Sequence, residues 1–163
     1  MEKLFLGIII VITCTLCGYL FSAKYRRRKQ FFTQFFEFNE RFISEISYYR
    51  RPLKECIARY AYKGEFSKML DHFFYVVEKK ESVTLFDGSN EFFFLKQDEQ
   101  RSIEDYFRML GKGDSASQKI YFGARKDELQ KWQSEAIITC KKYADLYIKL
   151  GFLFGLFLFI LLI

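Results

Sequence analysis

Apolar residues are concentrated at the two ends of the chain. The first apolar run, Leu4 to Ala23, contains no charged side chain, and the second, Leu150 to Ile163, is apolar throughout. About 20 apolar residues cross a bilayer core of roughly 30 Å, so the first run predicts a transmembrane helix. The second run has only 14 residues, but it lacks the polar stripe that a core helix keeps. If it is extended back through Tyr147, with Lys149 reaching the interface, it predicts a short membrane helix.

Positive charge lies on the inner side of both apolar runs. Lys141, Lys142 and Lys149 precede the second run. The basic cluster that follows the first run is Lys24, Arg26, Arg27, Arg28 and Lys29. Because basic flanks stay on the cytoplasmic side, the sequence predicts a two-pass membrane protein with spans over 1–23 and 150–163 and a cytoplasmic domain over 24–149. A cleaved signal peptide is disfavoured because its basic residues would precede the apolar run.

Between the two runs, apolar residues recur at steps of three and four, which is the period of a helix face. No breaker separates the first span from the domain, so one helix is predicted to continue until Arg51-Pro52, since a residue before proline avoids the helical region. Its predicted buried face is Phe31, Phe35, Phe38, Phe42, Ile46 and Tyr49.

Further helices are predicted over residues 52–63, 66–80 and 97–110. Gly64 and Gly111 would end two of them. The predicted buried face of the helix over 66–80 is Phe66, Met69, Leu70, Phe73, Phe74 and Val77. Residues 81–96 combine a turn signal with an apolar run that periodicity does not classify, so a short helix over 82–86 and another beginning near Asn90 are both open.

One long helix is predicted from residue 115 into the second span. Ser115 followed by Gln118 matches a capping box, in which the two side chains satisfy free backbone N–H groups. Gly123 lies inside the helix, where glycine costs about 1 kcal/mol relative to alanine, and is expected to mark a close helix crossing. The predicted fold is therefore all-α, with a cytoplasmic bundle of about five to six helices between two transmembrane helices.

Composition and motifs favour a non-enzymatic protein. The formal charge of +6 is mostly explained by the basic cluster, which suits anionic lipid; nucleic acid is the other possible partner but is disfavoured because the charge adjoins the membrane. His72 is the only histidine, and no phosphate loop is present. Carboxylates occur on the expected outer face of one helix: Asp98, Glu99, Glu104 and Asp105. We therefore expect no catalytic residue, metal, cofactor or small-molecule substrate.

Small residues recur at four-residue spacing in both predicted spans. Gly151 and Gly155 form a GxxxG motif. The first span carries Cys14, Gly18 and Ser22. Membrane helices associate where small residues let their backbones approach, so the spans are expected to pack on each other or on another membrane protein.

Several fragments, in this order and spacing, resemble the stage III sporulation protein AB family over the whole chain. The first is the segment Gly18 to Tyr25. The remaining fragments are Ser44 to Tyr48, which contains Glu45; Pro52-Leu53; Leu110-Gly111 followed by Asp114 and Gln118; and the closing anchor from Lys149 to Ile163. We assign Glu45, Pro52, Gly111, Asp114 and Gln118 structural roles in this pattern.

The resemblance implies a non-enzymatic membrane component of the channel complex between mother cell and forespore. Its cytoplasmic domain would be similar to those of type II secretion inner-membrane platform proteins. It would lie in the outer forespore membrane, face the mother-cell cytoplasm, and bind a secretion-type ATPase and other membrane proteins of the complex. The alternative is a basic membrane-surface adaptor that binds anionic lipid or nucleic acid.

Overall fold

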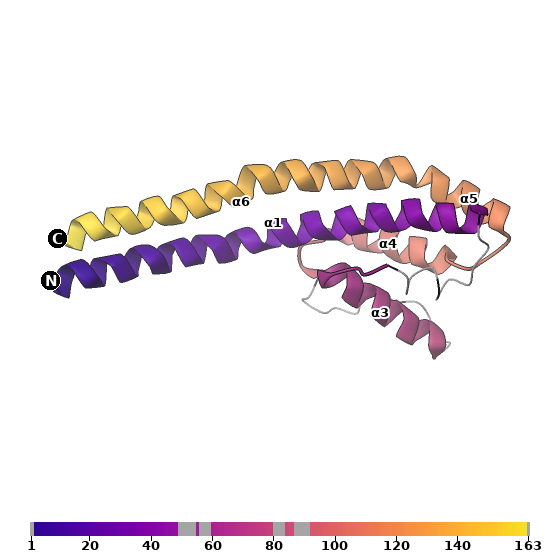
Figure 1. Ribbon diagram of the computed structural model, residues 1–163, viewed down its shortest axis with the longest axis horizontal. Helices are drawn as coiled ribbons and strands as arrows, with labels where there is room; N and C mark the ends of the chain where they lie inside the picture. The colour runs from indigo at the N-terminus through magenta and orange to yellow at the C-terminus, as the bar shows by residue number, and fades with distance from the viewer. Residues whose placement is uncertain (1, 49–54, 56–59, 80–83, 87–91, 163) are drawn as a thin grey trace. The chain divides into compact units, whose positions relative to one another are not determined.

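The computed structural model describes residues 2–48, 55, 60–79, 84–86 and 92–162. Over this part of the chain it contains five α-helices and no strand, which confirms the predicted all-α class (Figure 1). The helices are α1 (Glu2–Tyr48), α3 (Gly64–Glu78), α4 (Gln97–Met109), α5 (Ser115–Ala124) and α6 (Lys126–Leu162). The predicted helix over 52–63 is wrong for residues 60–63, which lie outside any helix, and Gly64, predicted to end it, is the first residue of α3. Of its other residues only Glu55 is described, and it is helical, so the predicted helix count stays a prediction.

The chain divides into two compact units. Unit 1 comprises Met1–Lys29 and Glu135–Ile163, and unit 2 comprises Gln30–Ser134. Both α1 and α6 contribute to each unit, because α1 is one helix of 47 residues and α6 one of 37 residues. The predicted continuity of the first helix is confirmed. The boundaries predicted at residues 23 and 149 were drawn at membrane edges rather than between compact units, and they stay predictions.

Unit 2 is built around an aromatic core on one face of α1. Every described residue of the predicted buried face of α1 is buried, as the helical period predicts: Phe31, Phe35, Phe38, Phe42 and Ile46. Phe35 meets Tyr106 of α4 with ring centroids 4.9 Å apart, and Phe42 meets Phe122 of α5 at 5.0 Å, both edge to face. Edge-to-face contacts between aromatic rings are favourable beyond the apolar area they bury. The phenylalanine stripe of α1 therefore holds the other helices of unit 2.

Helix α3 packs against this core through a face that keeps four of the six predicted residues and adds Val76. Its buried residues are Phe66, Met69, Leu70, Phe73 and Val76. Val77, which was predicted to be buried, is 45% exposed, and Phe74 is half-buried. At 100° per residue Val77 lies about 20° from the direction of Phe66 and Val76 about 80° from it, so the helical period favours Val77 and does not explain why Val76 is buried instead.

The segment before α4 is not helical where it is described. Thr84, Leu85 and Phe86 lie outside any helix, so the predicted helix over 82–86 is wrong for these three residues. A single tight turn follows at residues 92–95, closed by the N–H of Leu95 donating to the carbonyl of Phe92 at 2.9 Å. The predicted helix start near Asn90 lies outside the described residues.

The last predicted helix is interrupted. Arg125 lies in a turn between α5 and α6, so a single helix from residue 115 to the carboxyl terminus is wrong. The α5 cap is Asp114 rather than Ser115, since the Asp114 carboxylate accepts from the backbone N–H of Ser117 at 3.2 Å. Gly123 does not mark a close crossing, because a Cβ there would have no neighbour within 4 Å.

Candidate functional site

The predicted small residues come together in unit 1, where α1 and α6 pack side by side (Figure 1). A Cβ on Gly151 would lie 2.6 Å from the carbonyl oxygen of Cys14. A Cβ on Gly155 would lie 2.8 Å from the Cα of Val11, and one on Gly18 would collide with the carbonyl oxygen of Tyr147. The backbones are therefore as close as only glycine allows, which is how helices pack tightly in lipid.

We call this close contact between α1 and α6 at Gly18, Gly151 and Gly155 the helix seam. It includes one further glycine, Gly7, that the sequence analysis did not identify. A Cβ on Gly7 would collide with the ring of Phe159. Gly7, Val11, Cys14 and Gly18 follow steps of four, three and four, which keep them on one side of α1. That spacing was the available signal. Ser22, the remaining predicted packing residue, is buried, and its hydroxyl donates to the carbonyl of Tyr19 within α1 at 2.6 Å.

Tyrosines cluster where the apolar run meets the basic cluster. The ring of Tyr25 stacks on Tyr143 and on Tyr147 of α6, with centroids 5.3 and 5.8 Å away. Phe21 lies one turn further into the apolar run, 6.4 Å from Tyr147. Tyrosine is enriched at membrane–water interfaces because its ring is apolar and its hydroxyl is polar. This tyrosine stack therefore lies where an interface would be expected.

The basic cluster begins beside the tyrosine stack. Arg26 folds back along α1: its guanidinium carbon lies 3.7 Å from the centroid of the Tyr19 ring, and Nη2 donates to the Tyr19 carbonyl at 3.0 Å. Lys24, Arg27 and Lys29 are exposed, whereas Arg28 is half-buried. Each basic residue near an anionic surface contributes about 1 kcal/mol to attraction. The helix seam and the basic cluster together form the candidate functional site.

Of the family-motif residues, three organise the loop between α4 and α5. Gly111 has a φ of +76°, a conformation that favours glycine, and it ends α4. Asp114 caps α5, and the bonds from Ser117 lower the pKa of the Asp114 carboxyl. Gln118 is buried and its Nε2 donates to the carbonyl of Lys112 at 3.1 Å.

The other two motif residues lie earlier in the chain. Glu45 is buried, and its Oε1 accepts from the hydroxyl of Tyr60 at 3.2 Å. Pro52 lies outside the described residues.

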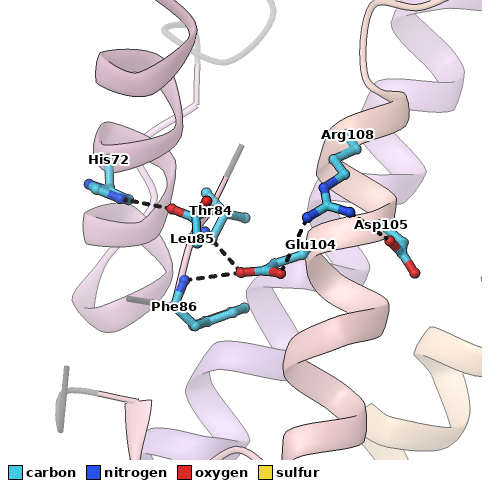
Figure 2. Close-up of polar contacts among 7 residues, drawn as sticks. All are labelled: His72, Thr84, Leu85, Phe86, Glu104, Asp105 and Arg108. Carbon is cyan, nitrogen blue, oxygen red and sulfur yellow. Dashed lines mark hydrogen bonds and ion pairs between the residues drawn. The ribbon is translucent and has the colours of Figure 1, made fainter. Parts of the chain in front are cut away.

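Two of the four carboxylates predicted to be solvated instead accept hydrogen bonds from backbone N–H groups. Glu99 is buried and accepts from the N–H of Lys96 at 2.9 Å. Figure 2 shows Glu104 accepting from the N–H groups of Leu85 and Phe86, at 3.1 and 3.3 Å. Asp98 and Asp105 are exposed, as predicted.

His72 of α3 contacts residues 84–86 from the side opposite Glu104 (Figure 2). Its Nε2 lies 3.2 Å from the carbonyl oxygen of Thr84 (Figure 2). Arg108 forms ion pairs with Glu104 at 3.8 Å and with Asp105 at 3.6 Å. These polar groups therefore fasten residues 84–86 between α3 and α4. Among the described residues, no group of three His, Cys, Asp or Glu side chains could hold a metal ion.

Comparison with known proteins identifies the family. Two helices of the described chain are long and apolar enough to cross a membrane. No curated protein and no solved structure matches the chain. The sequence model of the stage III sporulation protein AB family matches residues 3–163, which is nearly the whole chain. The chain therefore belongs to the stage III sporulation protein AB family.

Proposed function

We propose that this sporulation protein is a non-enzymatic membrane platform of a secretion-like channel complex, and that its cytoplasmic domain docks a secretion-type ATPase. The proposal places the basic cluster at the cytoplasmic face of the outer forespore membrane. Unit 2 would then lie in the mother-cell cytoplasm, and both chain ends on the opposite side.

The observation that carries the proposal is the pair of long helices. Each of α1 and α6 runs without interruption from an apolar segment of unit 1 into unit 2. In unit 1 their backbones approach closely at Gly18, Gly151 and Gly155. A domain held by two packed helices is anchored more firmly than one tethered by a loop. This is what a platform that receives force from an ATPase requires.

Unit 2 offers apolar side chains to a docking partner. Tyr75 of α3, Phe93 and Ile120 of α5 are 52%, 58% and 75% exposed. Large exposed apolar and aromatic side chains are frequent anchors of protein interfaces. We take these three residues as the first candidate contacts for the ATPase.

To test the proposal, the full chain in lipid nanodiscs is incubated with an extract of sporulating cells. The proteins that it captures are identified by mass spectrometry. We expect a secretion-type ATPase at both moderate and high salt, since apolar contacts resist screening. Ile120→Asp, Phe93→Ser and Tyr75→Ser are tested singly, and at least one should reduce capture. Gln130→Asp, an exposed polar position on α6, is the control, and empty nanodiscs give the background.

Failure to capture any ATPase at either salt would contradict the platform proposal. The basic cluster supports the second candidate, a membrane-surface adaptor, because Lys24, Arg27 and Lys29 are exposed. A membrane-surface adaptor would instead bind only nucleic acid or anionic lipid, and its affinity would fall steeply as the salt concentration rises.

A further inference from the structure

An apolar groove of about 510 Å³ runs along one side of the helix seam in unit 1. Its wall on α1 is Thr13, Cys14, Cys17, Gly18 and Phe21, and its wall on α6 is Tyr147, Leu150, Gly151 and Phe154. The small side chains of the seam leave this space open. Packing of the two helices on each other therefore does not fill it.

The distance along α1 from the basic cluster to the far end of the groove matches the thickness of one bilayer leaflet. Thr13 is eleven residues before Lys24, which at 1.5 Å per residue is about 16 Å along the helix. Half of a hydrocarbon core of roughly 30 Å is about 15 Å. The groove therefore reaches from the basic end of the span to about the middle of a bilayer.

The walls of the groove suit a hydrocarbon tail. Phe21, Leu150 and Phe154 are 67%, 51% and 59% exposed, so the apolar walls face outward from the helix pair. In a bilayer the acyl chain of a neighbouring lipid is the apolar group that surrounds such walls.

A positive charge lies beyond the basic end of the groove: Lys24 does not line the groove, and its Nζ lies 4.9 Å from the centroid of the Tyr25 ring. Lys24 is exposed, and it follows Phe21 by three residues and Cys17 by seven, which keeps it on the same face of α1. Tyr147 lines the groove and stacks on Tyr25. An ammonium group beside tyrosine hydroxyls is complementary to a phosphate.

We propose that the groove binds one anionic phospholipid from the leaflet on the basic side, with one of its two acyl chains between α1 and α6 and its phosphate at Lys24. The inference rests on the proposed membrane anchoring of unit 1. It goes beyond that anchoring because it assigns a defined lipid site. General attraction of the basic cluster to a charged surface would not select one position along the helices.

The test uses the full chain in nanodiscs that contain phosphatidylglycerol with a photoactivatable group on its tail, and the adducts are mapped by mass spectrometry. We expect adducts on the groove residues, lost on competition with unlabelled phosphatidylglycerol but not with phosphatidylcholine. Cys17→Trp should fill the groove and lower labelling at least fivefold. Leu20→Trp is the matched control, because Leu20 is 70% exposed and lies outside the groove. Lys24→Gln should weaken phosphatidylglycerol competition about fivefold.

Equal labelling around both spans, or equal competition by the two lipids, would overturn the proposal. Cross-linking of a second copy into the groove would overturn it as well. Circular dichroism of each variant shows whether the helices persist. Incorporation of the full chain into nanodiscs and capture of the ATPase are scored separately. Loss of either one bears on the proposed function, whereas uniform labelling of an incorporated protein bears only on the lipid site.

Discussion

At the scale of single residues, the Tyr106–Asn39 pair is the most informative contact in unit 2. The Tyr106 hydroxyl donates to Oδ1 of Asn39 at 2.9 Å, and both side chains are buried. Tyr106→Phe would leave the Asn39 oxygen without this donor inside the aromatic core. A buried polar group left unsatisfied costs about 1–3 kcal/mol, so we expect the free energy of unfolding to fall by about that amount.

Trp132 provides the signal for this measurement. It is the only tryptophan of the sequence, and it packs on Phe32 at 5.5 Å within unit 2. Urea unfolding followed by its fluorescence should place Tyr106→Phe at a lower midpoint than the wild type. Tyr75→Phe, at an exposed position, should change stability by less than about 0.5 kcal/mol. Equal midpoints for Tyr106→Phe and the wild type would show that the buried bond contributes nothing.

The same residue predicts a dependence on alkaline pH. Burial raises the pKa of Tyr106 well above the usual value near 10. Above pH 10 the unfolded chain releases this proton and the folded chain keeps it, so the stability that is present below pH 10 is lost as pH rises. The slope contributed by one such group is at most about 1.4 kcal/mol per pH unit. Between pH 10 and 11, Tyr106→Phe should therefore lose stability less steeply than the wild type. Parallel slopes would contradict this assignment.

The sequence predicted most of the buried apolar residues but not the buried polar ones. The period of three and four on α1 identified Phe31 to Ile46 because a helix face repeats regularly along the chain. Glu99 was predicted to be solvated but is buried, and Glu45, whose burial was not predicted, is buried as well. Glu99 is buried because it bonds to the N–H of Lys96 at the start of its own helix. The partner of Glu45 is Tyr60, fifteen residues away, and helix periodicity does not identify such a pairing.

At the scale of elements, Glu104 is expected to control the segment over residues 84–86. Its carboxylate accepts from two backbone N–H groups (Figure 2), and its side chain is only 17% exposed. Hydrogen bonds to a charged group are worth about 1.5–3 kcal/mol. Glu104→Ala should therefore speed hydrogen exchange at Leu85 and Phe86 by roughly tenfold to a hundredfold.

Asp105→Ala is the matched control for Glu104, because Asp105 is the neighbouring carboxylate, is 59% exposed and also pairs with Arg108. Exchange at Leu85 and Phe86 should be unchanged in that variant. If Asp105→Ala accelerated exchange as much as Glu104→Ala, the effect would come from Arg108 rather than from the two backbone bonds.

The helix seam gives a second prediction at this scale, from two glycines in different settings. Gly151→Ala would place a Cβ 2.6 Å from the carbonyl oxygen of Cys14. The two backbones would have to separate, at a cost of about 1–3 kcal/mol, and the thermal midpoint in detergent should fall. Gly123→Ala meets no atom within 4 Å and should be neutral or stabilising by up to about 1 kcal/mol. A shift of the same sign for both variants would contradict the assignment of the seam.

Helix ends were harder to predict than helix existence. Ser115 and Asp114 are both good caps by residue type, and the choice is made by which oxygen reaches the N–H of Ser117. The turn that separates α5 from α6 lies at Arg125, which is neither glycine nor proline. Arg125 there donates to Glu128 and to Ser102 of α4, at 2.6 and 3.2 Å. A contact with α4 is not visible in the local sequence of α5 and α6.

At the scale of the whole molecule, the two apolar helices and the basic cluster favour the proposed topology, in which both helices span the membrane and unit 2 is cytoplasmic. The first apolar run, the aromatic ring stack at Tyr25 and the basic cluster lie along α1 in the order expected for a membrane, its interface and the cytoplasm. The docking, platform and lipid proposals all depend on that order. The sequence alone predicted two apolar helices because composition determines them, whereas the groove depends on which residues of α1 meet which residues of α6.

The measurement that tests this account most directly is the side of the membrane on which unit 2 lies. Cys14, Cys17, Cys56 and Cys140 are replaced by serine or alanine, and a single cysteine is introduced either by Ser115→Cys, at an exposed position, or after Ile163. Intact vegetative cells that express the full chain, in which it would lie in the plasma membrane, are treated with a membrane-impermeant maleimide. We predict labelling of the carboxyl-terminal cysteine in intact cells, and labelling of the cysteine at position 115 only after permeabilisation. Labelling at position 115 in intact cells would contradict the cytoplasmic platform and every proposal that depends on it.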